Sequence, residues 1–168
     1  MFVLGIDPGL SRCGYACLET TLGRQVRAVA LGVLTTPPTA PLPARLGELR
    51  RELSALFDDL RPDAVAVEQV FFQVNVRTAM AVGQASGLAL AEAAVRGLDV
   101  VQYTPNQVKE AVAGWGGADK GQVARMVQAR LGLAGPAKPT DAADAAALAL
   151  CHLAMAPTRA RMAAAVRR

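Results

Sequence analysis

The sequence has few cysteines and no long apolar run, and each shortage excludes a class of protein. Cys13, Cys17 and Cys151 are odd in number and lack paired Cys-x-x-Cys spacing, so neither a disulfide framework nor a zinc site is expected. Apolar stretches are interrupted well short of the roughly 18 residues that a membrane span needs, and no basic-apolar leader comes first. We therefore expect a cytoplasmic protein without a membrane segment.

The 168 residues, of which 52% are hydrophobic, suffice for one domain with a sizeable core. The net charge is +4, and all but three of the 18 basic residues are arginines. Arginine suits bidentate phosphate contacts, so a polyanionic partner is compatible with this composition. An ordinary soluble surface is equally compatible with it.

Apolar periodicity and turn residues predict an alternation of strands and helices. The expected strands are 2–6, 14–19, 26–34, 64–67 and 99–103, and the expected helices are 46–60, 78–96, one from 105, one from 119, and 141–155. The proline-rich stretch 36–43 is expected to be a loop. This order indicates an α/β fold, with a mixed sheet that starts as an antiparallel meander and carries helices on both faces. Residues 1–156 would form the domain and 157–168 a basic, flexible tail.

Four carboxylates lie at the edges of apolar elements. Asp7 and Glu68 each follow a buried strand, while Asp141 and Asp144 lie three apart on one helix face. Local alternatives are an Asx-turn for Asp7 and the helix dipole for Asp141. No adjacent basic residue neutralises the four, so on convergence their repulsion would raise their pKa values unless a cation lay between them. Four hard oxygen ligands favour two Mg²⁺ or Mn²⁺ ions and phosphodiester hydrolysis.

Gly83 and Gly87 lie four residues apart on one face of the predicted helix 78–96. Small residues at this spacing let another helix approach closely. That helix could belong to the core of the same chain or to a second copy in a dimer.

Six separated motifs agree, in order and spacing, with one known family. They are GIDPGLSRCGYA at the start, VEQVFF at Glu68, VGQASG around Gln84, QVKEAV at Lys109, DKGQV at Asp119 and DAADAAALAL at Asp141. Over roughly residues 1 to 155 the sequence resembles the RuvC Holliday junction resolvases of bacteria. The resemblance implies an RNase H-like fold of the retroviral integrase superfamily and a homodimer that cooperates with RuvA and RuvB. It also implies Mg²⁺-dependent paired nicks in four-way junction DNA that leave 5′-phosphate and 3′-hydroxyl ends.

Carried over by position, the resemblance makes the four carboxylates the metal-binding catalytic acids. Some members have histidine where Asp141 stands, so this chain resembles an all-carboxylate version. The residues expected at DNA are Phe71, Arg77, Gln84, Lys109 and Lys120. Without the resemblance, the two lysines would be ordinary solvated helix residues, and either Phe71 or Phe72 could be the exposed one. His152 lies two turns beyond Asp144, too far to share its ion.

Two other functions compete with the resolvase. An actin-like nucleotide phosphotransferase also places Asp-x-Gly after a strand, but such a protein needs two domains around the nucleotide. A non-catalytic module would bind four-way junctions without cleaving them. The complete set of four acids favours the enzyme.

Overall fold

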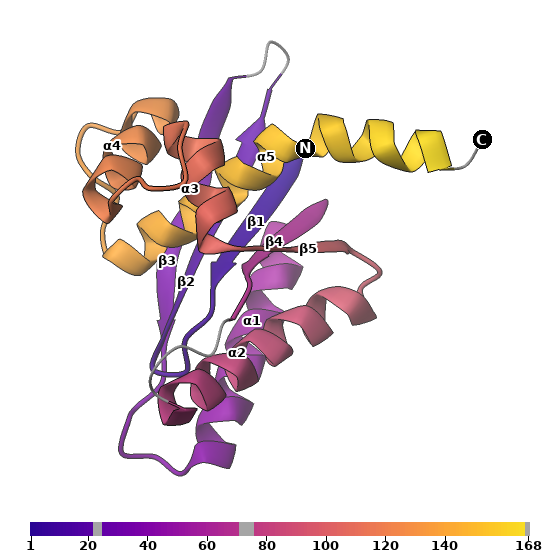
Figure 1. The fold of residues 1–168 in the computed structure, drawn as a ribbon. Helices are drawn as coiled ribbons and strands as arrows, with labels where there is room; N and C mark the ends of the chain where they lie inside the picture. The colour runs from indigo at the N-terminus through magenta and orange to yellow at the C-terminus, as the bar shows by residue number, and fades with distance from the viewer. Residues whose placement is uncertain (22–24, 71–75, 167–168) are drawn as a thin grey trace.

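The computed structural model describes residues 1–21, 25–70 and 76–166, with the backbone alone at 76–77, 160, 163–164 and 166 (Figure 1). The elements in chain order are β1 (Phe2–Asp7), β2 (Arg12–Thr20), β3 (Val26–Thr35), α1 (Leu42–Leu60), β4 (Ala64–Glu68), α2 (Val76–Val95), β5 (Asp99–Tyr103), α3 (Pro105–Ala113), α4 (Lys120–Leu131) and α5 (Thr140–Val166). Within these ranges no helix has both the length and the apolar character to cross a bilayer.

The five strands form one mixed sheet in the order β3-β2-β1-β4-β5. β1, β2 and β3 pair antiparallel, which confirms the predicted meander, whereas β4 runs parallel to both β1 and β5. The carboxyl ends of β1, β4 and β5 therefore meet at the same edge of the sheet.

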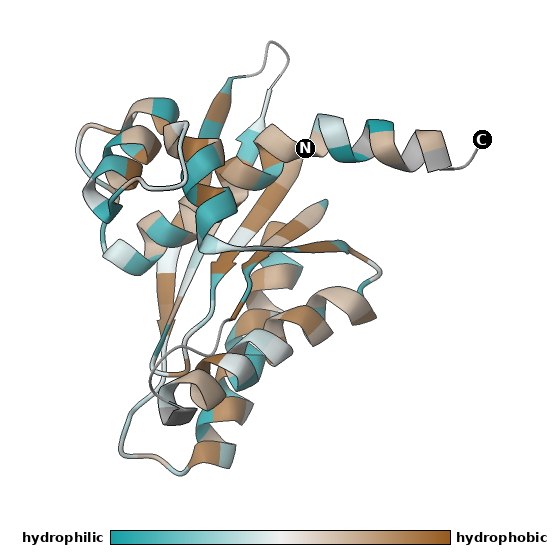
Figure 2. Ribbon diagram, viewed as in Figure 1, coloured by the Kyte–Doolittle hydropathy of each residue, from teal (hydrophilic) through white to brown (hydrophobic). Residues whose placement is uncertain are grey.

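The sheet is covered on both faces, as the sequence predicts. α1 and α2 cover one face, and α3, α4 and α5 cover the other (Figure 1). The central strands are predominantly apolar along their length (Figure 2), because both of their faces are buried. In β1, Leu4 and Ile6 pack toward α1 and α2, while Val3 packs toward α5.

Gly5 and an alanine-rich helix bring α5 against β1. Gly5 points toward α5, and a methyl group there would overlap the carbonyl oxygen of Ala145 and lie 2.9 Å from the backbone nitrogen of Ala149. Only glycine allows this approach, and the small side chains of α5 maintain it. The first half of α5 is accordingly buried against the sheet.

Two predicted boundaries are wrong. α1 begins at Leu42, inside the stretch predicted to be a loop, because a proline such as Pro43 is tolerated in the first turn of a helix. The last helix continues through Pro157 to Val166 instead of ending near residue 155. Proline removes one backbone hydrogen bond, and alanine-rich flanks favour the helix on either side.

We expect Gly5→Ala to lower the free energy of unfolding by about 3 kcal/mol or more, because α5 must move away from β1. Gly47→Ala is the matched control. Its new methyl group on α1 would find its nearest neighbour, the Arg51 guanidinium, at 3.8 Å, and should raise stability by about 0.5–1 kcal/mol. Urea unfolding measures both changes, and equal stability of Gly5→Ala and wild type would contradict this packing.

Candidate active site

Asp7 and Glu68 end two neighbouring parallel strands. Ile6 of β1 is paired with Val67 of β4. The next residues of the two strands, Asp7 and Glu68, therefore lie on adjacent strands at the same edge of the sheet. Side chains alternate between faces along a strand, and Ala66 packs on the α5 side of the sheet. Asp7 and Glu68 therefore project toward α5, and both are half-buried.

The other two carboxylates come from the start of α5. A methyl group at Gly14 of β2 would overlap the backbone carbonyl oxygen of Asp141, so glycine lets this helix end rest on the sheet. Gly14 is the register partner of Asp7. Asp144 lies almost one helical turn further along, and its charge acts on both Asp7 and Glu68. The fold thus gathers the four acids that the sequence singles out.

Two cations distant in sequence bind the acids of α5. The Arg12 guanidinium donates to Oδ2 of Asp141 from Nη2 at 2.7 Å and from Nε at 3.1 Å. The Lys120 ammonium donates to Oδ2 of Asp144 at 3.3 Å. These partners lie 129 and 24 residues away from the acids, so the absence of an adjacent basic residue in the sequence did not exclude cationic partners in the fold.

Arg12 was not singled out by the sequence. It lies on the same face of β2 as Gly14, because the two residues are two positions apart and side chains alternate between faces along a strand. That alternation could have indicated Arg12 once the helix start was known to lie over Gly14. The contact itself depends on tertiary packing.

The pKa values of the two strand acids shift in the opposite direction from that of Asp141. Burial, followed by the charges of Glu68, Asp144 and Asp141, raises the pKa of Asp7 to about 7, although Lys120 opposes this shift. Burial and then Asp144 also raise the pKa of Glu68. By contrast, the hydrogen bond from Arg12 lowers the pKa of Asp141.

The site carries more negative than positive charge. When all four carboxylates are ionised, Arg12 and Lys120 offset two of their charges and two negative charges remain. Across the described ranges, no three acidic, histidine or cysteine side chains lie close enough together to hold a metal ion. Asp141 and Asp144 of α5 each form an ion pair with a cation. Asp7 and Glu68 of the strands form no ion pair with the described residues.

Of the residues predicted to contact DNA, Lys120 contacts one of the four acids, and the others differ in exposure and position. Lys120 is the first residue of α4, where a capping box between Asp119 and Gln122 fixes the start of the helix. Lys109 is half-buried on α3, and Gln84 is exposed on α2. Phe71 and the side chain of Arg77 lie outside the described residues.

His152 has a structural environment. It is 1% exposed, and its Nδ1 lies 3.2 Å from the hydroxyl of Tyr103 in the core. It is buried rather than solvated, and burial lowers its pKa. Its position agrees with the expectation that it takes no part in the carboxylate cluster.

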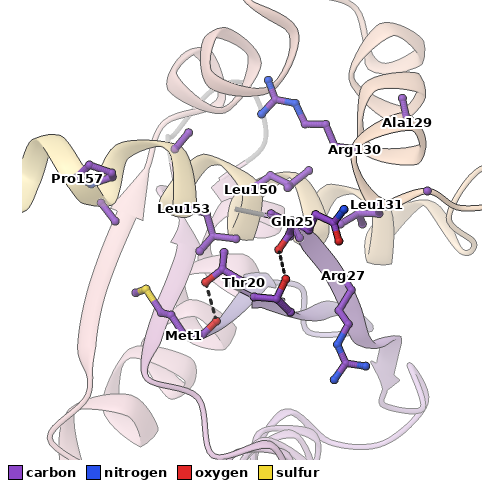
Figure 3. A pocket seen from close by; sticks show the side chains of 15 residues that line it. Met1, Thr20, Gln25, Arg27, Ala129, Arg130, Leu131, Leu150, Leu153 and Pro157 are labelled. Atoms are coloured by element: carbon purple, nitrogen blue, oxygen red, sulfur yellow. Dashed lines mark hydrogen bonds between the residues drawn. The ribbon is translucent and has the colours of Figure 1, made fainter. Parts of the chain in front are cut away.

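A hollow of about 870 Å³ lies elsewhere, between the ends of β2 and β3 and helices α4 and α5 (Figure 3). Thr20, Arg27, Leu131, Leu153 and Pro157 are among the residues that line it. None of the four carboxylates is among its described lining residues. The hollow is thus distinct from the carboxylate cluster.

Comparison with known proteins identifies the family. The family model described as crossover junction endodeoxyribonuclease RuvC matches residues 3–152. The chain belongs to the RuvC family. The crossover junction endodeoxyribonuclease RuvC of Salinispora arenicola is 52% identical over 168 residues, which are 100% of this chain and 96% of that protein. Its counterpart in Chloroflexus aggregans is 50% identical over 158 residues, which are 94% of this chain and 96% of that protein.

Solved structures agree with the RuvC assignment. Thermus thermophilus RuvC is 38% identical with a TM-score of 0.86, over 94% of this chain and 96% of that one. The complex of that protein with a Holliday junction substrate has a TM-score of 0.87 at 38% identity, over 93% and 94% of the two chains. The fold is therefore RNase H-like, as the sequence predicts. Membership of this family favours the nuclease over the nucleotide phosphotransferase.

Membership of the RuvC family implies a divalent metal ion, and the donor atoms and net charge of the cluster suit one. The cluster offers hard carboxylate oxygens, the donors that Mg²⁺ and Mn²⁺ prefer. Its two uncompensated negative charges match one divalent cation. A cation there would also remove the repulsion that raises the pKa of Asp7.

We expect the contribution of Asp7 to the stability of the metal-free protein to become unfavourable as the pH rises from about 4 to 7. In this window folded Asp7, with a pKa of about 7 against an ordinary 3.8, keeps a proton that the unfolded chain releases. Rising pH then favours the unfolded chain by roughly 1.4 kcal/mol for each pKa unit of the shift. Asp7→Asn cannot ionise, so in urea unfolding with EDTA it should gain stability relative to wild type as the pH rises from 5 to 8.

Asp59→Asn is the control, because it removes the same charge from an exposed position of α1. It should follow the wild-type pH profile. Adding Mn²⁺ at pH 8 should stabilise wild type more than Asp7→Asn. Parallel profiles for wild type and Asp7→Asn would contradict a buried, uncompensated Asp7.

Proposed function

We propose that this chain is a Holliday junction resolvase, an endonuclease that makes paired, symmetric nicks in four-way junction DNA during recombination and repair. The observation that carries the proposal is the gathering of four carboxylates at one sheet edge, in a chain of the RuvC family. The products would carry 5′-phosphate and 3′-hydroxyl ends. The similarity to a RuvC structure in complex with a Holliday junction substrate supports the choice of DNA.

Asp7, Glu68, Asp141 and Asp144 would hold Mg²⁺, for which Mn²⁺ could substitute. Charge supports two ions per site: if Arg12 and Lys120 left their partners, four negative charges would remain for two divalent cations. Such ions lower the pKa of a water nucleophile and stabilise the oxyanion that leaves the phosphodiester. Asp7 is the acid that the charges of the other three all reach, which suits a position between the two ions.

Arg12 and Lys120 would exchange partners when DNA binds. Both side chains are exposed, at 50% and 89%, so each can turn from its carboxylate to a phosphate at little cost. Lys120 begins a capped helix and its ammonium group contacts Asp144, which supports a position next to the scissile strand when DNA is bound. The protein would act mainly by positioning and by stabilising charge.

The remaining DNA contacts follow the family. Phe71 would stack on junction bases, and Arg77, Gln84 and Lys109 would contact the strands around them. The exposure of Gln84 supports this proposal, and so does the position of Lys109 on the same side of the sheet as the carboxylates. The protein would work in the cytoplasm with the RuvA and RuvB branch-migration proteins, with residues 1–156 as the nuclease domain and 157–168 as a basic extension.

A homodimer would present two such sites to two strands of one junction. The outward face of α2 supports this proposal, because Met80, Gly83, Gly87 and Val95 are all exposed in the single chain. A methyl group at Gly83 or Gly87 would touch nothing within 4 Å among the described residues, so these glycines are not needed for packing against that part of the chain. A second α2 could approach closely there.

Asp144→Asn should abolish cleavage and leave junction binding nearly unchanged, because the variant loses a metal ligand and retains the fold. The assay incubates an end-labelled mobile junction and its matching linear duplex with Mg²⁺ or Mn²⁺, and maps the products on a denaturing gel. Wild type and the surface control Asp59→Asn should nick only the junction, symmetrically. Wild-type binding without nicks in either ion would refute the enzyme, and cleavage of both substrates would refute junction selectivity.

Gly87→Arg should convert the dimer to a monomer, since a long charged side chain would separate the two α2 helices. Sedimentation velocity at working concentration measures the change. Ala55→Arg, at an exposed position of α1, is the control and should remain dimeric. A monomeric wild type would refute the proposed interface.

A further inference from the structure

Trp115 is a large aromatic side chain exposed to solvent, on the turn that precedes Lys120 and α4. It is the single tryptophan of the chain and is 56% exposed, on the turn that joins α3 to α4. Neither the carboxylate chemistry nor the packing of the core uses its outer surface. An aromatic ring of this size in water is costly, which directs attention to what it could contact.

The turn that carries Trp115 is held at both ends. Gly114 adopts a left-handed conformation with φ of 89° and donates its N–H to the carbonyl of Glu110, which closes α3. On the other side, the N–H of Ala118 donates to the carbonyl of Trp115 at 3.3 Å, and Ala118 is fully buried. The indole is therefore presented from a short, ordered turn.

The indole rests on a glycine. A methyl group at Gly117 would overlap the six-membered ring of Trp115, so the ring lies directly against the backbone at this position. This contact orients one part of the indole and leaves the rest open. A flat, oriented and accessible aromatic surface is the feature that stacks on nucleic acid bases.

The turn leads straight into the active site. Lys120 lies five positions after Trp115 in the chain, a span of at most about 18 Å even when fully extended. The ammonium group of Lys120 lies 3.3 Å from Asp144. An indole at this distance can reach a nucleotide a few steps from the scissile phosphate, since successive nucleotides of a duplex strand rise by about 3.4 Å.

We propose that Trp115 stacks on a base exposed at the crossover of a four-way junction, and so adds a structure-selective contact next to the cleavage site. Bases inside an uninterrupted duplex are already stacked on both faces and offer no surface to the indole. At a crossover the stack is interrupted, and a base face becomes available. This inference rests on the proposed function, because it takes the junction as substrate.

The single tryptophan provides a direct measurement. Wild type is titrated in EDTA, which keeps the DNA uncut, with an unlabelled four-way junction and with the matching linear duplex. Tryptophan emission and an independent gel shift are recorded together. The junction should quench the emission and the linear duplex should not, although both bind through their phosphates.

Three variants separate stacking from a structural role of the turn. Trp115→Ala should bind the junction about tenfold more weakly, with duplex affinity unchanged, and Trp115→Phe should keep most of the affinity. Gly117→Ala retains the indole but displaces it from its resting place, so it should also weaken junction binding. Met162→Ala is the control, because Met162 is 65% exposed near the other end of α5.

The outcomes distinguish this inference from the function on which it rests. Junction binding in the gel shift with unchanged tryptophan emission, or with equal affinity for Trp115→Ala, would overturn the role of Trp115 and leave the resolvase intact. Equal quenching by junction and duplex would overturn stacking at the crossover. Absence of junction binding by wild type in the gel shift would overturn both.

Discussion

The close approach of α5 to β1 and β2 is the constraint on which the site depends. Two glycines face the helix, and a methyl group at Gly5 or at Gly14 would overlap a backbone carbonyl of α5. Asp141 and Asp144 begin the helix that these glycines admit, so the distance between helix and sheet also sets the distance between the acids. Packing and chemistry are thus controlled by the same backbone contact.

This arrangement places negative charge where it is poorly solvated. Burial and repulsion raise the pKa of Asp7 to about 7. Asp141 and Asp144 of the helix form ion pairs with Arg12 and Lys120. The folded chain therefore gives up stability at the position where a divalent cation would recover it. Strain of this electrostatic kind is typical of a site built for a charged ligand.

The two faces of the sheet carry different surfaces. The face covered by α3, α4 and α5 supplies Lys120, which binds Asp144 from the capped start of α4, and Trp115 on the turn before that helix. The opposite face carries α1 and α2, and the outward surface of α2 is rich in small and apolar residues around Gly87. The central sheet, buried on both faces, fixes the positions of these two surfaces relative to each other.

Apolar periodicity, helix caps and strand ends are local patterns, so they were enough to predict the strands, most of the helices and the four carboxylates. The sequence misplaced the start of α1 and the end of α5, since a proline is a helix breaker or a helix starter according to its context. Only the tertiary structure decided that Arg12 binds Asp141, 129 residues away, and that Trp115 remains in solvent. Such contacts depend on strand order and helix placement, which no local pattern encodes.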